Sequence, residues 1–139
     1  MRRVTLTCTL MLPLFAAGCG NNNPVSPTPP GPPVSVTDNF SGTVTRNGAT
    51  THTFPLSSAL GGDVTATLKS IAPDDTAVLG MSLGTWNGTG CQAVISNDRA
   101  TVSSAILGRA TSGGTLCVRM FDAGVLNEPQ DYQIEVVHP

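Results

Sequence analysis

Apolar and polar residues alternate along most of the chain from residue 36 to residue 139. Because successive side chains of a strand point to opposite faces of a sheet, this period of two predicts half-buried β-strands. The predicted strands cover residues 40–44, 52–56, 64–69, 79–83, 91–96, 100–107, 116–121 and 132–136. No window carries the stripe of apolar residues, three and four apart, that is typical of a helix.

Turn-forming residues separate these segments. Asn47-Gly48 predicts a tight hairpin turn, Gly61-Gly62-Asp63 a second turn, and Pro73-Asp74-Asp75 interrupts the chain before the fourth strand. About eight short strands with turns between them are typical of a β-sandwich or jelly roll. We therefore predict an all-β fold, a single jelly-roll-like antiparallel β-sandwich over residues 36–139.

Residues 1–18 have the pattern of a bacterial lipoprotein signal peptide. Met1-Arg2-Arg3 precedes a mostly apolar run of roughly 14 residues, shorter than the ~20 that span a bilayer as a helix. The run closes on Ala16-Ala17-Gly18-Cys19, which resembles the lipobox whose cysteine becomes the lipidated first residue. The alternative is an ordinary secretory signal with an incidental Cys19. Gly20, where inner-membrane retention usually shows aspartate, favours the outer membrane in a diderm bacterium.

Residues 19–35 are predicted to be the lipid-anchor cysteine and a flexible linker. The stretch from Asn21 to Pro33 reads NNNPVSPTPPGPP and carries no charge. Proline fixes the backbone φ and removes hydrogen-bond donors, so this stretch favours an extended polyproline conformation. At ~3.1 Å per residue it would hold a domain up to ~40 Å from the membrane.

The charge balance excludes several classes of partner. Once Arg2 and Arg3 leave with the signal, five basic residues remain against nine acidic ones. The mature chain is therefore acidic and has no basic cluster, which argues against binding nucleic acid or anionic lipid through the domain. The expected contact with a membrane is through the lipid anchor, and we expect a monomer.

The four cysteines predict one disulfide. Cys8 lies in the signal and Cys19 would carry lipid, which leaves Cys91 and Cys117. In an oxidising compartment an even number of remaining cysteines indicates a disulfide. This disulfide would stabilise the fold by about 3 kcal/mol. A zinc site is the alternative, but two cysteines without a nearby histidine do not complete a tetrahedral site.

Several segments of the predicted strands and turns form a further pattern: Phe40-Ser41-Gly42-Thr43-Val44, Thr53-Phe54, 62–68, Asp74-Asp75, 79–83, 114–120 and 131–136. Together they resemble the bacterial pre-peptidase C-terminal (PPC) domain. The resemblance covers nearly all of residues 36–139 and implies a jelly-roll-like sandwich, usually a non-catalytic appendage of secreted enzymes and sometimes a binder of polymers. Leu116 stands where that family often has tyrosine, and the Cys91/Cys117 pair is not part of its general pattern.

Gly80-Met81-Ser82-Leu83-Gly84 is formally a G-x-S-x-G motif, followed by Asp122 and His138 in the order of a hydrolase triad. In hydrolases the serine lies on a strained turn between a strand and a helix. Here the strand alternation continues through Ser82, and no helix is predicted after it. We therefore predict no enzyme, with a small serine hydrolase using Ser82 as a remote alternative.

Two aromatic residues are candidates for ligand binding. Trp86 lies in a Gly-rich turn, where an exposed indole would stack on a sugar ring; the alternative is that it plugs one end of the core. Phe121 is on the strand face opposite Leu116, Val118 and Met120, either exposed or covered by the disulfide region.

Turn carboxylates are the only candidates for a metal. Asp74 and Asp75 would contribute oxygens to a calcium site, which needs ~6–8 of them. The alternative is that these aspartates are solvated turn formers. No other cofactor is expected.

These patterns predict a non-catalytic cell-envelope lipoprotein whose β-sandwich binds an envelope protein or polysaccharide. The alternative is a purely structural envelope lipoprotein without a discrete ligand site.

Overall fold

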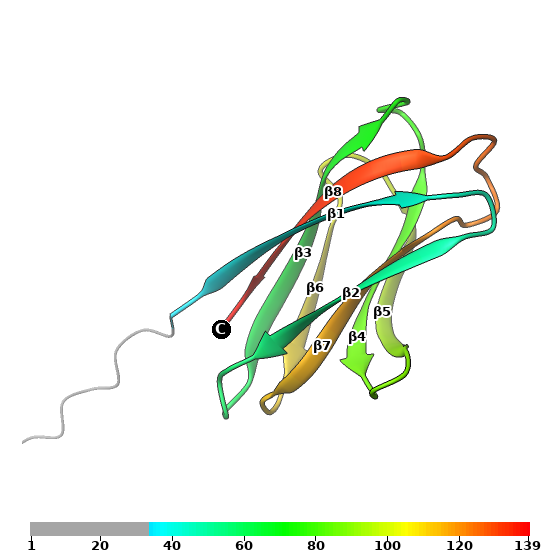
Figure 1. Ribbon diagram of the computed structural model, residues 1–139. Helices are drawn as coiled ribbons and strands as arrows, with labels where there is room; N and C mark the ends of the chain where they lie inside the picture. The colour runs from blue at the N-terminus through cyan, green and yellow to red at the C-terminus, as the bar shows by residue number, and fades with distance from the viewer. Residues whose placement is uncertain (1–33) are drawn as a thin grey trace, which may run out of the picture. The chain divides into compact units, whose positions relative to one another are not determined.

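The computed structural model describes residues 34–139, which contain eight β-strands and no helix (Figure 1). The strands are β1 (Val36–Val44), β2 (Ala49–Leu56), β3 (Gly62–Ala72), β4 (Leu79–Trp86), β5 (Cys91–Ala100), β6 (Ala105–Ala110), β7 (Gly114–Phe121) and β8 (Gln130–His138). No helix in this part of the chain is long and apolar enough to cross a membrane. The predicted signal peptide, Cys19 and the proline-rich linker up to residue 33 lie outside the described residues.

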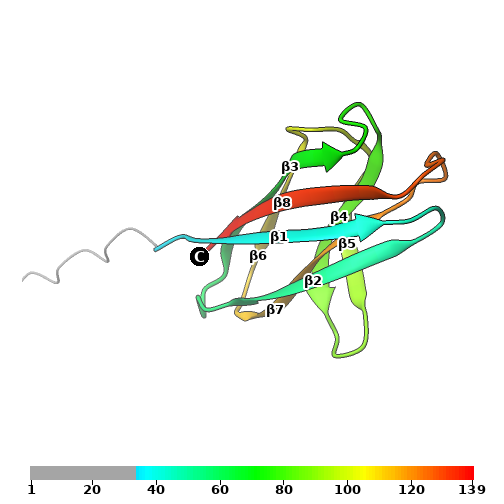
Figure 2. The same ribbon diagram turned by 45° about the horizontal axis from the view of Figure 1, so that its top comes forward.

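The strands form two four-stranded antiparallel sheets packed face to face (Figure 2). Sheet A has the order β1-β8-β3-β6, and sheet B has the order β2-β7-β4-β5. Only β4 and β5 are both consecutive in the chain and neighbours in a sheet; every other connection crosses between the sheets. This is the strand order of a jelly roll, so the predicted fold class is confirmed.

Residues that face inward from both sheets form the core, as the period of two predicts. The largest fully buried side chains are Tyr132, Phe54, Leu68, Leu79, Met81, Met120 and Ile134. They come from strands of both sheets and pack into one apolar cluster. The core therefore fills the space between sheet A and sheet B.

Two details of the sequence-based prediction were wrong. Asn47-Gly48 does form a tight turn, with the Gly48 N–H donating to the Thr45 carbonyl at 2.8 Å. That turn makes no hairpin, however, because β1 pairs with β8 and β2 pairs with β7. Asn47 also ties this connection to the β7–β8 loop, since its N–H donates to Asp122 at 2.8 Å.

The second error concerns the strand predicted over residues 100–107. β5 continues to Ala100, a turn follows, and β6 begins only at Ala105. The turn is closed by the Ser104 N–H donating to the Thr101 carbonyl, and Ser103 adopts a φ of 72°. The turn contains neither glycine nor proline, and apolar and polar residues continue to alternate through it, so nothing in the sequence indicated a turn.

Candidate functional site

A cavity of about 430 Å³ opens at one end of the sandwich, between sheet B and the edge strand of sheet A. It lies among the ends of β4 and β6, the start of β7 and the β6–β7 loop, with β5 along one side. In Figure 1 the β4–β5 and β6–β7 connections are both at the lower end of the sandwich. The volume falls within the range of small-ligand sites, which is ~300–1,000 Å³.

Part of the cavity lining is apolar. It includes Val64, Leu83, Ile95 and Leu116. Gly108 on β6 faces the same space, and a Cβ there would lie 2.8 Å from Cδ2 of Leu83. The glycine therefore leaves room for Leu83.

Trp86 and Val94 lie on the two strands that bound the cavity on the side of sheet B. Trp86 is the last residue of β4, lines the cavity and is half-buried. It is therefore neither the fully exposed indole nor the buried core plug that the sequence left as alternatives. Val94 is 74% exposed and is an extra residue in β5, since Leu83 pairs with Ile95 but Gly84 pairs with Ala93. A β-bulge of this kind on an edge strand re-aims side chains next to a site.

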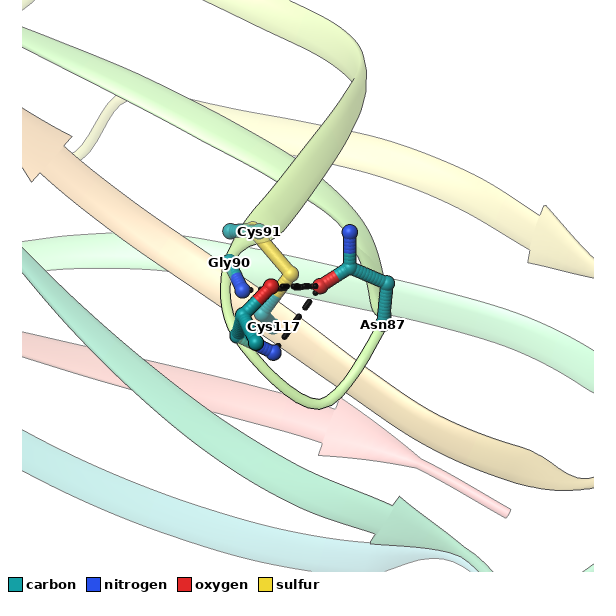
Figure 3. Close-up of a disulfide and its surroundings, with 5 residues drawn as sticks. Asn87, Gly90, Cys91 and Cys117 are labelled. Carbon is teal, nitrogen blue, oxygen red and sulfur yellow. Dashed lines mark hydrogen bonds between the residues drawn. A yellow bond between two sulfur atoms is a disulfide. The ribbon is translucent and has the colours of Figure 1, made fainter.

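The turn that follows Trp86 is closed by one asparagine side chain (Figure 3). Oδ1 of Asn87 accepts hydrogen bonds from the N–H groups of Thr89 and Gly90, at 2.9 and 2.8 Å, and from the Thr89 hydroxyl at 3.0 Å. The Asn87 N–H donates to the Gly90 carbonyl at 3.2 Å. The turn is therefore internally bonded, and it fixes the chain between Trp86 and Cys91.

The predicted disulfide between Cys91 and Cys117 is confirmed. It joins the first residue of β5 to β7, although β4 lies between these strands in the sheet. Cys117 is completely buried, and the two Cα atoms are 5.7 Å apart. Figure 3 shows the bridge beside the Asn87 turn, so the crosslink anchors the hairpin that carries Trp86.

The β6–β7 loop and its flanks contribute small and hydroxyl-bearing residues to the lining. They are Thr111, Ser112 and Thr115, together with Gly113 and Gly114. Arg109 is the one charged residue along the cavity wall, and it is paired with Asp63 at 2.9 Å. The arrangement suits a neutral ligand with both apolar and hydroxyl surfaces.

Phe121 lies away from this cavity. It is opposite Gly80 in the β4–β7 pairing, near the start of β4, whereas Trp86 ends that strand. The Phe121 ring lies across Gly80, since a Cβ there would be 2.2 Å from the ring. Phe121 is half-buried by this contact, so it is neither freely exposed nor covered by the disulfide region.

The residues of the formal hydrolase motif do not assemble into a triad. Ser82 lies in the middle of β4, it is 1% exposed, and its Oγ has no hydrogen-bond partner within residues 34–139. A serine nucleophile needs a base within hydrogen-bond reach. Asp122 instead accepts bonds from the N–H groups of Gly124, Val125 and Leu126 in the β7–β8 loop.

Asp74 acts as a turn former. Its Oδ1 accepts hydrogen bonds from the N–H and the hydroxyl of Thr76, at 2.9 and 2.6 Å. These bonds lower the pKa of Asp74 below its ordinary value. Among the described residues no three His, Cys, Asp or Glu side chains come together as a metal site, around Asp74 and Asp75 or elsewhere.

A cluster of aromatic and polar side chains lies between β1, β2 and β8 and was not predicted from the sequence. His52 stacks on Phe40 with ring centres 4.9 Å apart, and its Nε2 shares a hydrogen bond with the Tyr132 hydroxyl at 2.8 Å. His138, the last residue of β8, is 2% exposed, and its Nε2 lies 3.1 Å from Oδ2 of Asp38. The pairing of β1 with β8 and the packing of sheet A against β2 of sheet B bring these residues together.

The burial of His52 predicts that the fold loses stability in acid. Burial lowers the pKa of His52 below its ordinary value of 6.5, so the folded chain binds fewer protons than the unfolded chain just below pH 6.5. Stability present above pH 6.5 is therefore lost progressively as the pH falls toward the lowered pKa. The melting temperature should drop across this window, and the drop should shrink in His52→Gln. An equal drop in both proteins would contradict this assignment.

These features define an eight-stranded jelly-roll domain with an apolar cavity at one end. No protein-family model matches the chain, and no curated protein matches it by sequence. Among solved structures, the Yersinia pseudotuberculosis-derived mitogen is similar at a TM-score of 0.54 and 17% identity, over 74% of this chain and 86% of that one. Aeromonas hydrophila PliG, a periplasmic inhibitor of g-type lysozyme, gives 0.49 and 12%, over 73% and 84%. At these identities the likeness concerns the fold.

Proposed function

We propose that the chain is a lipid-anchored protein of the bacterial cell envelope, and that its β-sandwich binds an envelope polysaccharide in the Trp86 cavity without catalysing a reaction. The lipobox-like Cys19 and the proline-rich tether support the anchoring, with the outer membrane as the site in a diderm bacterium. The Cys91–Cys117 disulfide suits an oxidising compartment outside the cytoplasm. The resemblance to PPC domains, some of which bind polymers, agrees with this function.

The position of Trp86 carries the proposal. A half-buried indole at the wall of an open cavity offers an apolar ring to the face of a sugar. Thr111, Ser112 and Thr115 line the same space, and their hydroxyls would bond sugar hydroxyls. The one charged side chain of the wall, Arg109, is already paired. A neutral sugar chain matches this combination better than a charged ligand does.

The chain has a single tryptophan, so its fluorescence reports on this cavity alone. The test uses the soluble chain, residues 20–139, with its disulfide formed, and polysaccharide extracted from the envelope of the source bacterium. The emission of Trp86 should change saturably with added polysaccharide. By calorimetry, Trp86→Ala should bind at least about tenfold more weakly, since an aromatic side chain buries ~150–250 Å².

Val125→Ala serves as the matched control, because Val125 is exposed in the β7–β8 loop, away from the cavity. It should bind as the parent does. Equal affinities of the parent and Trp86→Ala would refute the cavity as the binding site.

An envelope protein is the second candidate ligand. Val94 and Leu107, on the edge strands of sheets B and A, are 74% and 66% exposed, and apolar side chains on strand edges favour contact with another polypeptide. Binding of an envelope protein that is lost in Val94→Ser with Leu107→Ser, without any binding of polysaccharide, would favour this candidate.

A further inference from the structure

We infer that the outer face of sheet B holds a second site, for the carboxylate groups of an acidic polysaccharide, centred on Arg119. The strand register places four polar residues in one row across this face. Arg119 on β7 lies opposite Thr51 on β2 and opposite Ser82 on β4, and Ser82 lies opposite Ser96 on β5. The inference does not depend on the Trp86 cavity.

The guanidinium of Arg119 is held in place without an ion-pair partner. Its central carbon lies 5.1 Å from the centre of the Phe121 ring, and Phe121 is fixed against Gly80. Within residues 34–139, Arg119 takes part in no salt bridge, whereas Arg109 and Lys69 are paired with Asp63 and Glu135. A half-buried guanidinium stacked on a ring keeps its N–H donors available in a defined plane.

The hydroxyl of Ser82 is the second observation that points to a ligand. It is 1% exposed and lacks a hydrogen-bond partner in the described part of the chain, which is costly for a buried polar group. Its neighbours on the same face of β4 are Gly80 and Gly84, which have no side chains. Arg119 lies opposite Ser82 in the register, so a ligand oxygen held by the guanidinium would supply the acceptor that this hydroxyl lacks.

The surroundings select a carboxylate on a sugar. A carboxylate matches the guanidinium fork with two parallel hydrogen bonds. Arg119 is the one cation in this row, and a single cation matches the single charge of a carboxylate better than the higher charge of a phosphate group. Thr51 and Ser96 are exposed and would bond sugar hydroxyls. The row itself carries one guanidinium and three hydroxyl groups and no large apolar side chain, which suits an acidic sugar better than an apolar peptide segment.

The experiment measures binding of the soluble chain, residues 20–139, to polygalacturonate at fixed ionic strength. The parent should bind polygalacturonate, and any binding of neutral dextran should be unaffected by changes at Arg119. Arg119→Gln should bind about tenfold more weakly or worse, and Arg119→Lys, which keeps the charge but loses the fork, should restore little. Arg99→Gln is the matched control, because it removes an equal charge from an exposed position on edge strand β5.

Ser82→Ala separates a role in binding from a role in folding. Removal of an unsatisfied buried hydroxyl should raise the melting temperature, while loss of its bond to the ligand should weaken binding of polygalacturonate. Parent-like binding by Arg119→Gln, or equal losses in Arg119→Gln and Arg99→Gln, would overturn the site. Polyglutamate bound as tightly as polygalacturonate would overturn the assignment to a sugar. Because the cavity is tested through Trp86 and this face through Arg119, either proposal can fail alone.

Discussion

Replacement of both Cys91 and Cys117 by alanine is expected to lower the free energy of unfolding by about 3 kcal/mol. The bridge closes a loop between residues 26 apart in the sequence, and its loss returns that freedom to the unfolded chain. For a domain of this size the melting temperature should fall by roughly 10–15 °C. Binding at the cavity should weaken as well, because the bridge holds the first residue of β5 against β7 and so fixes the hairpin that carries Trp86.

The reduced parent protein is the control for this prediction. A reducing agent should bring the parent to the stability of the Cys91→Ala/Cys117→Ala variant and leave the variant itself unchanged. If the variant melts at the temperature of the oxidised parent, the crosslink contributes nothing to stability. Alanine is the appropriate replacement, since Cys117 is completely buried and a serine hydroxyl there would need a hydrogen-bond partner.

The fold could be predicted because the core alternates strictly along most strands. In β8, Tyr132, Ile134 and Val136 are all buried while their neighbours Asp131 and Gln133 are exposed. In such a strand the residues themselves show which face packs against the core. The same alternation does not show which strands are hydrogen-bonded neighbours, so the strand pairing could not be predicted. The sequence Asn47-Gly48 is compatible with a turn between two paired strands and with a turn between strands of different sheets. The structure shows that it joins β1 of sheet A to β2 of sheet B.

The candidate site could be predicted only in part. Trp86 and the two cysteines were visible as residue types that are rare in this chain. The cavity itself was not, because it depends on the bulge at Val94 and on the absence of a side chain at Gly108. The row of Thr51, Arg119, Ser82 and Ser96 comes from four strands, and its register follows from the sheet order. Spacing along one chain contains no such information.

Gly84→Ala is expected to destabilise the fold by about 1–3 kcal/mol and to disturb the cavity at the same time. A Cβ on Gly84 would lie 1.9 Å from the carbonyl oxygen of Gln92 and 2.9 Å from the Cα of Ala93. Both atoms belong to the backbone of β5, so no side-chain rotation relieves the clash and the strand has to move. Because this is where the bulge at Val94 begins, a shift of β5 also moves the cavity wall next to Trp86.

Gly90→Ala in the same hairpin is the matched control. A Cβ at Gly90 would meet no atom within 4 Å, and the Gly90 N–H that donates to Asn87 is kept. Urea unfolding should therefore show a lower midpoint for Gly84→Ala and a nearly unchanged one for Gly90→Ala, with the tryptophan emission shifted only in the former. Equal midpoints would mean that β4 and β5 are not packed at the bulge as described. Because the two glycines lie six residues apart in one hairpin, the comparison separates the close approach of the β5 backbone from the general effect of adding a methyl group.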